Sequence, residues 1–159
     1  MGRGGSRVAE RRFTDYETLA DLRYQLRRFQ RVREIAARAA GVAPQQYQLL
    51  LQVKGLDGRG AATIGALAER LQISHHGVVQ LVDRLARRHL IERRPGEDRR
   101  EVVVRLRPPG ETLLRRLAGY SIAELTTEGP RLVASLRRLL AQSTRRGTSS
   151  TRGRRKGRR

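Results

Sequence analysis

The 159-residue sequence contains no cysteine. Without a thiol, the chain can form no disulfide, no thiolate zinc site and no iron–sulfur cluster, and it has no cysteine nucleophile or thiol redox switch. Only three histidines are present, and the adjacent pair His75 and His76 would diverge by about 100° on a helix. No other ligand residue joins that pair at metal-binding spacing. We therefore expect no metal and no cofactor.

Catalytic patterns are also missing. The segment 60–65 has the glycine spacing of a phosphate-binding loop, but Ala66 and Leu67 follow where Lys and Ser or Thr are required. The carboxylates Glu97 and Asp98 are adjacent, yet the arginines around them would keep both ionised on an exposed turn. With no pair of a nucleophile and a base elsewhere, the sequence does not predict an enzyme.

The sequence has no long hydrophobic run. Its longest stretch without a charge, residues 41–53, contains four glutamines and is shorter than the roughly 18 apolar residues that span a membrane. The arginines near the N-terminus are not followed by an apolar block, so they do not form a secretory signal. We expect a soluble, cytoplasmic protein, located at the nucleoid, with no membrane partner.

Acidic residues are few, with 15 Asp and Glu against 35 Lys and Arg, and the net charge of +20 indicates a polyanion as partner. Residues 1–12 and 143–159 carry a large part of this charge but almost no apolar residues, so we predict that both basic ends are disordered. The tail 143–159 is interpreted either as a solvated extension or as a non-specific DNA attachment.

The middle of the chain has a helical pattern in its first part. Apolar residues at steps of three and four predict a long helix over about 15–40, and Pro44 is typical of the first turn of a second helix that ends at Gly55. Thr63 and Ser74 are predicted to cap two further helices through their hydroxyl groups. In the helix after Ser74, one apolar face leaves a polar face that carries histidines, a glutamine and arginines.

The pattern then changes from a helical period to alternation. Residues 90–94 and 101–107 predict two strands joined by the turn 95–98, which is a hairpin with four arginines at its tip, Arg93, Arg94, Arg99 and Arg100. Two amphipathic helices are predicted afterwards, at about 110–125 and 130–142, separated by Gly129 and Pro130. The terminal helices need a partner for their apolar faces, either each other or a second copy, so we expect a helical dimer interface.

Two short helices followed by a basic hairpin form a winged helix-turn-helix. The second helix of the pair fits the major groove of DNA, where Gln80 can form two hydrogen bonds with adenine, and further along the helix Arg84, Arg87 and Arg88 can bind phosphates. An arginine of the hairpin can enter the minor groove, and we expect Asp98 to orient the Arg100 side chain. The candidate DNA contacts are Ser74, His75, His76, Gly77, Val79, Gln80, Arg84, Arg87, Arg94, Asp98, Arg99 and Arg100.

These segments resemble the MarR family of bacterial transcriptional regulators over roughly residues 14–142. The resemblance is carried by TIGALAERL at 63–71, VVQLVDRL at 78–85, LIERRP at 90–95, EDRR at 97–100 and VVVRL at 102–106. It implies a homodimer that binds double-stranded DNA at an inverted-repeat operator, usually as a repressor. It also implies a pocket for a small aromatic or phenolic ligand, although the absence of cysteine excludes the thiol-oxidising sensors of the family.

The sequence departs from the family pattern at three places. Gly77 replaces a residue that usually carries a hydroxyl group, which would alter the operator contacts. Gln72 replaces the usual turn glycine and is expected to strain the turn, and residues 106–110 lack a threonine that would cap the following helix.

The resulting prediction is a mainly α fold with a small β-hairpin wing (α+β), a winged helix-turn-helix whose N- and C-terminal helices form a dimerisation domain. The predicted regions are the ends 1–12 and 143–159, the dimerisation region 13–43 with 109–142, and the DNA-binding domain 44–108. Four aromatic residues are interpreted either as the lining of the ligand pocket or as core or interface: Tyr16, Tyr24, Phe29 and Tyr47. A non-specific nucleoid-associated or RNA-binding protein is the alternative to a ligand-responsive, sequence-specific regulator.

Overall fold

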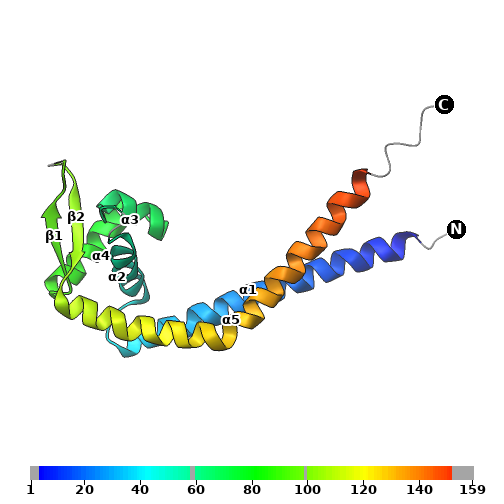
Figure 1. Ribbon diagram of the computed structural model, residues 1–159, viewed down its shortest axis with the longest axis horizontal. Coiled ribbons are helices and arrows are strands. Elements are labelled where there is room, and N and C mark those ends of the chain that lie inside the picture. The colour runs from blue at the N-terminus through cyan, green and yellow to red at the C-terminus, as the bar shows by residue number, and fades with distance from the viewer. Residues whose placement is uncertain (1–3, 58–59, 99, 152–159) are drawn as a thin grey trace. The chain divides into compact units, whose positions relative to one another are not determined.

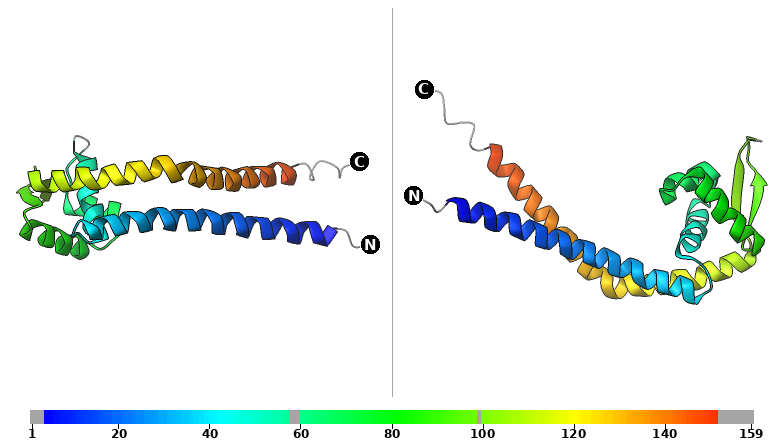
Figure 2. Two further views of the ribbon diagram at one scale, coloured as in Figure 1. Left: turned by 90° about the horizontal axis from the view of Figure 1, so that it is seen from below. Right: turned by 180° about the vertical axis from the view of Figure 1, so that it is seen from behind.

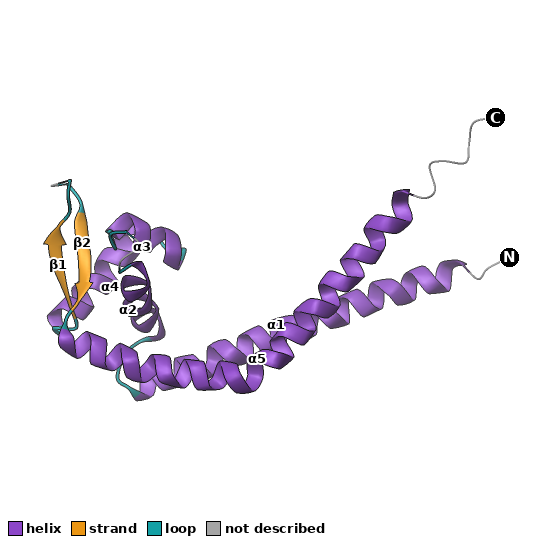
Figure 3. Ribbon diagram, viewed as in Figure 1, coloured by secondary structure: helices purple, strands orange, loops and turns teal. Residues whose placement is uncertain are grey.

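The computed structural model describes the backbone of residues 4–57, 60–98 and 100–151, and the side chains of 16–57, 60–98 and 100–141. Its elements are mostly helical, with one two-stranded hairpin, as predicted (Figures 1 and 3). They are α1 (Gly4–Ala39), α2 (Pro44–Leu56), α3 (Ile64–Leu71), α4 (His75–Arg87), β1 (Ile91–Pro95), β2 (Val102–Leu106) and α5 (Pro108–Thr151). No described helix is long and apolar enough to cross a membrane.

The chain divides into two compact units. The terminal unit combines α1 up to Arg31 with α5 from Ala123, and the central unit spans Val32–Ile122. The central unit is wider at both ends than the predicted DNA-binding domain 44–108, because the end of α1 and the beginning of α5 contribute Ala37, Leu114 and Leu117 to its core.

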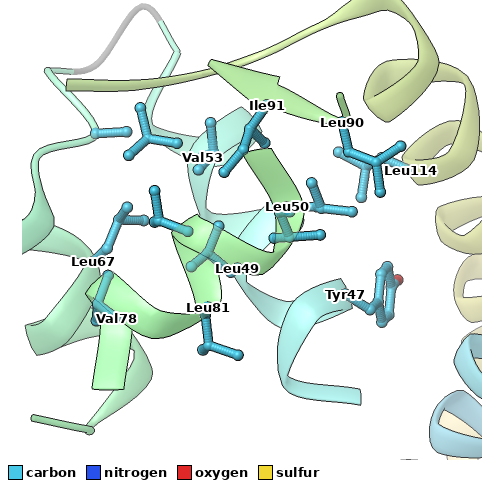
Figure 4. Packing of buried hydrophobic residues seen from close by; sticks show 14 of the residues in the cluster. Tyr47, Leu49, Leu50, Val53, Leu67, Val78, Leu81, Leu90, Ile91 and Leu114 are labelled. Atoms are coloured by element: carbon cyan, nitrogen blue, oxygen red, sulfur yellow. The ribbon is translucent and has the colours of Figure 1, made fainter. Parts of the chain in front are cut away.

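The core of the central unit is built around α2. Leu49 and Leu50 are fully buried, and side chains of α3, α4, β1, β2 and α5 pack around them (Figure 4). Tyr47 is also buried, and its hydroxyl group forms a hydrogen bond of 2.9 Å with the Ser121 hydroxyl group. Pro44 begins α2 as predicted, while the helix continues to Leu56, one residue beyond the predicted end at Gly55.

The two predicted hydroxyl caps are confirmed. The Thr63 side chain accepts a hydrogen bond from the Ala66 N–H, and the Ser74 side chain accepts one from the Gly77 N–H. Both caps satisfy one of the backbone donors that have no partner within the first turn of a helix. They fix where α3 and α4 begin, and thereby the turn of the helix-turn-helix.

Three helix ends share one backbone arrangement, in which a residue with positive φ reverses the chain. Gly41, Gln72 and His89 have φ values of 75°, 54° and 56° after α1, α3 and α4. In each case the next residue donates its N–H to the carbonyl group five positions earlier, as from Leu90 to Leu85. This is the Schellman arrangement, which favours glycine because a side chain strains the left-handed conformation. The strain predicted at Gln72 is therefore confirmed.

The hairpin is antiparallel, with Ile91 opposite Leu106 and Pro95 opposite Val102. A third segment joins it, because Thr63 forms a bridge with Val103 and the Val104 N–H donates to the Ala62 carbonyl group at 2.9 Å. This backbone pairing fixes the hairpin to the beginning of α3, and the sequence did not predict it.

The two predicted C-terminal helices are one continuous helix, α5, with Pro130 inside it. A proline removes one hydrogen bond of a helix and commonly ends it. Here α5 contacts α1 on both sides of the proline, through the Arg28–Glu128 ion pair before it and the Asp21–Ser135 hydrogen bond after it. We attribute the continuity to these contacts, and the predicted break at 129–130 was wrong.

The helix α5 begins without the threonine cap of the family pattern. Pro108 and Pro109 occupy the first two positions of the helix, where they carry no N–H that needs a partner. Gly110 is buried, and a Cβ atom there would lie 2.0 Å from the Leu90 carbonyl oxygen. The same oxygen accepts a hydrogen bond from the Arg107 N–H. Glycine at 110 therefore allows α5 to begin against the end of the turn after α4.

In the terminal unit, α1 and α5 run side by side in opposite directions (Figure 2). Asp21 accepts hydrogen bonds from the Ser135 hydroxyl group and, at 2.8 Å, from Arg138. The bond from Ser135 is the main cause that lowers the pKa of the Asp21 carboxyl, with Gln25 and Arg138 contributing in the same direction. Pairing of the terminal helices with each other is thus confirmed.

The described helices extend into both segments for which the sequence predicts disorder. The backbone is helical from Gly4 and up to Thr151. Residues 1–3 and 152–159 lie outside the described residues, as do the side chains of 4–15 and 142–151. Disorder of 1–12 and 143–159 in solution stays a prediction.

Candidate nucleic-acid interface

The helix α4 presents one exposed polar face. Its apolar face, with Val78, Leu81, Val82 and Leu85, is buried in the core, as the spacing predicts. The opposite face is exposed and carries His75, His76, Gln80, Arg84 and Arg87. All five are predicted DNA contacts, and α4 brings them together on one surface.

The remaining candidates of α4 have structural roles. Ser74 is exposed but its hydroxyl group caps the helix. Gly77 is half-buried, and a Cβ atom there would lie 3.2 Å from the Ser74 Oγ. The absence of a side chain at 77 therefore leaves room for the Ser74 hydroxyl group that caps the helix. Val79 is partly buried against the core, which makes it a packing residue on one side.

A pair of charged residues joins α4 to the hairpin. Asp83 is the only acidic residue of α4, and its carboxylate forms an ion pair with Arg93 of β1. Arg93 was one of four arginines expected at the basic tip, so this part of the interpretation needs correction. The pair removes the single negative charge of α4 from the exposed polar face and links that helix to the wing.

Arg88 also differs from its expected role as a phosphate contact. One of its terminal nitrogens donates a hydrogen bond of 2.8 Å to the Gly41 carbonyl oxygen, 47 residues away. The bond holds the end of α4 against the turn after α1. Only the tertiary structure brings these two positions together.

The tip of the wing is organised by backbone hydrogen bonds. The Arg100 N–H donates to Asp98 Oδ1 at 2.9 Å, and the Glu101 N–H donates to the Asp98 carbonyl group at 2.9 Å. Asp98 thus bonds the backbone of Arg100, where the sequence predicted a bond to its guanidinium group. The carboxylate shapes the turn that presents Arg100, which is exposed.

The other two predicted wing contacts are Arg94 and Arg99. Arg94 is exposed and its Nε donates to Glu92 on the same strand at 2.6 Å. Arg99 lies outside the described residues. Within β1, the carboxylate of Glu92 therefore offsets the positive charge of Arg94.

The four aromatic candidates for the ligand pocket are divided between the two units. Tyr47 is buried in the central unit, where it belongs to the core. Tyr16 and Tyr24 are exposed on the terminal unit, and Phe29 is half-buried beside a cavity of only about 10 Å³. Within the described side chains, no group of three or more acidic or histidine residues is arranged to hold a metal ion.

A larger groove, with a volume of about 480 Å³, lies between α2 and the hairpin. At its edge Lys54 Nζ donates to Glu111 at 2.9 Å and to Asp57 at 3.1 Å. The bond to Glu111 is the main cause that raises the pKa of Lys54. The sequence did not indicate this network, because Glu111 is far from Lys54 along the chain.

Comparison with known proteins finds one sequence family and several solved structures that this chain resembles. The sequence model described as MarR family matches residues 40–101, which contain α2, α3, α4, β1 and the turn of the hairpin. Over these residues the chain is similar to the MarR family.

Several solved structures share the fold of this chain. A MarR family transcription regulator designated SP03579 is 24% identical with a TM-score of 0.68, over 91% of this chain and 98% of that one. AbsC from Streptomyces coelicolor is 19% identical with a TM-score of 0.62, over 82% and 89%. A mutant of MarR from E. coli, complexed with operator DNA, is 20% identical with a TM-score of 0.59, over 76% and 89%. No curated protein sequence matches the chain.

Proposed function

We propose that this protein is a transcriptional regulator of the MarR family, a homodimeric repressor that binds double-stranded DNA at an inverted-repeat operator. The observation that carries the proposal is the exposed face of α4. It offers two histidines, a glutamine and two arginines, while Asp83, the only acid of the helix, is bonded to Arg93. The complex of a MarR mutant from E. coli with operator DNA supports the same class of partner.

The proposed interface assigns two kinds of contact. His75, His76 and Gln80 lie in the major groove, where Gln80 meets a base edge, because that groove admits a helix and displays a distinct pattern of donors and acceptors for each base pair. Arg84 and Arg87 bind phosphates, which position the protein without reading sequence. In the wing, Arg100 enters the minor groove from the turn that Asp98 stabilises, together with Arg94 and Arg99.

Dimerisation is supported by the distribution of exposed apolar side chains. Among the described side chains, thirteen large hydrophobic residues are exposed, and all but Val102 lie on α1 or α5. A concentration of exposed apolar groups on two helices marks an interaction surface. A two-fold dimer presents two copies of α4, which fits an inverted repeat. The twelve residues are Tyr16, Leu19, Tyr24, Leu26, Val32, Ile35, Tyr120, Ile122, Leu125, Val133, Leu136 and Leu140.

The decisive experiment is footprinting of the purified protein on the DNA that flanks its own gene. We expect a protected site with two-fold symmetry, and affinity that falls about 10³- to 10⁵-fold between 50 and 200 mM salt for six to ten phosphate contacts. Arg84→Ala should reduce the affinity and the salt slope, whereas Arg137→Ala, on α5, should change neither. Uniform protection that ignores sequence would contradict the proposal and favour the non-specific nucleoid or RNA-binding alternative.

We also propose that a small aromatic or phenolic ligand lowers operator affinity, as the family resemblance implies. Binding would act by favouring one spacing of the two recognition helices. A thermal-shift screen of aromatic acids, followed by operator binding with each compound that raises the Tm, tests this part separately. Operator affinity that none of the bound compounds changes would contradict it.

The basic tail is proposed to add non-specific affinity. Removal of 143–159 deletes eight basic residues and no acidic one. We expect the truncated protein to bind all DNA more weakly and with a smaller salt slope, while the protected site stays in place. Loss of the protected site would instead make the tail part of specific recognition.

A further inference from the structure

His76 and Gln80 form a side-chain pair on the exposed face of α4. They are four residues apart, which places them on the same side of a helix, and Gln80 Nε2 lies 2.9 Å from His76 Nε2. An amide nitrogen only donates hydrogen bonds. In this bond the His76 Nε2 atom therefore accepts, which requires the tautomer that carries its proton on Nδ1.

We infer that His76 is a positioning residue that determines which base Gln80 reads. The inference deepens the proposed function, because it requires α4 to lie in the major groove. The inference concerns the orientation of the Gln80 carboxamide. A sequence-specific contact depends on this orientation, whereas general affinity for DNA does not.

The orientation of the Gln80 amide follows from the number of hydrogen-bond donors and acceptors that it has. With one N–H bonded to His76, Gln80 retains its carbonyl oxygen and a second N–H for DNA. One acceptor and one donor match adenine, which presents an amino donor and the N7 acceptor in the major groove. A partner at 76 that could only donate would bind the Gln80 oxygen instead. Both N–H groups would then point to DNA and match guanine, which presents two acceptors, O6 and N7.

The test substitutes His76 by residues with a defined hydrogen-bond role. His76→Glu can only accept, and His76→Lys can only donate, whereas His76→Ala does neither. Each variant is measured against a set of operator duplexes in which all four bases are placed in turn at each half-site position. The ratio of affinities between bases is the readout, since an added charge changes the affinity for all duplexes alike through the phosphates.

We expect the wild-type protein and His76→Glu to prefer adenine at one position, and His76→Lys to prefer guanine there by about tenfold. His76→Ala should relax the preference, so the glutamate variant acts as a rescue. In the Gln80→Ala background, the same substitutions at 76 should no longer change the ratio.

Two results would overturn the inference while the proposed function stands. Base ratios that stay the same in all three single variants would show that Gln80 is oriented without His76. Ratios that still change in the Gln80→Ala background would show that His76 reads the base itself. A wild-type protein with no base preference at any position would be a failure of the proposed function, and it would overturn the inference with it.

Discussion

The two units of the chain differ in where their apolar residues lie. Every buried hydrophobic side chain of the described part belongs to the central unit, whereas the two buried residues of the terminal unit, Thr18 and Ser135, are polar. The terminal unit instead exposes leucines on both helices, such as Leu26 and Leu136. A unit that buries its own core can be stable alone, but one that exposes its apolar residues needs a partner.

This difference separates two kinds of stability. Contacts within the central unit determine the free energy of unfolding of that unit, independently of protein concentration. Contacts of the terminal unit determine association, and their effect depends on concentration. Four predictions test the difference, in order of decreasing effect.

The largest effect is expected for Gly110→Ala in the central unit. The new Cβ atom would lie 2.0 Å from the Leu90 carbonyl oxygen, which is backbone and cannot rotate away. We expect a loss of about 3 kcal/mol in the free energy of unfolding, measured by urea denaturation. Gly119→Ala is the matched control on the same helix, because a Cβ atom there meets no atom within 4 Å. Equal stability of the two variants would refute the close packing at 110.

The next effect is expected for Leu136→Ala in the terminal unit. Its side chain is 45% exposed in the single chain, so its removal should change the unfolding of the central unit little. If a partner covers it, truncation loses about 1.5–3 kcal/mol of burial, which is roughly a 10- to 100-fold weaker dimer. Sedimentation at several concentrations measures this. Arg137→Ala is the neighbouring control, and a dimer constant that does not differ between the two variants would contradict the interface.

A smaller gain is expected for Gln72→Gly in the central unit. Glycine removes the strain of φ 54°, but it also loses the Gln72 Nε2 bond to the Glu69 carbonyl group and makes the unfolded chain more flexible. We expect a net stabilisation of about 0.5–1 kcal/mol by urea denaturation. Gly41→Ala is the reverse test at an equivalent helix end and should destabilise by a similar amount. Destabilisation by Gln72→Gly would show that the hydrogen bond outweighs the strain.

The smallest effect is expected for Asp21→Asn in the terminal unit. The pKa of the Asp21 carboxyl is lowered in the folded protein, mainly by Ser135, so its contribution is complete above the ordinary pKa of about 3.9 and is lost as pH falls through the folded value. The variant should melt slightly below the wild type at pH 7, and the difference should vanish towards pH 3. Glu17→Gln, on the same helix, serves as control. A difference that grows on acidification would have the wrong sign.

Much of the fold could be predicted from local signals. The caps at Thr63 and Ser74, the change of period at the hairpin and the strained Gln72 depend on residues within a few positions of each other. The break predicted at Pro130 was wrong because contacts with α1 on both sides of the proline maintain the helix. Local propensity is a weak guide wherever distant segments pack together.

For the candidate site, the sequence predicted which residues of α4 are exposed, but not the bonding partners of several charged side chains. The exposed face of α4 follows from its apolar spacing. The spacing could not show that Arg93 bonds Asp83, that Arg88 bonds the Gly41 carbonyl group, or that Asp98 bonds a backbone amide. The count of arginines therefore did not reveal that Arg93 and Arg94 pair with carboxylates of the same chain.

The sequence by itself determined the excess of positive charge, the absence of thiol chemistry, the helical and strand periods and the family motifs, since these are properties of composition and near neighbours. Only the tertiary structure decided which cations are bonded within the protein and which face outward. It also assigned the buried core to the central unit and left the leucines of α1 and α5 exposed. The reason is physical: charge pairing and burial depend on distances in space, and residues far apart along the chain set those distances only when the chain has folded.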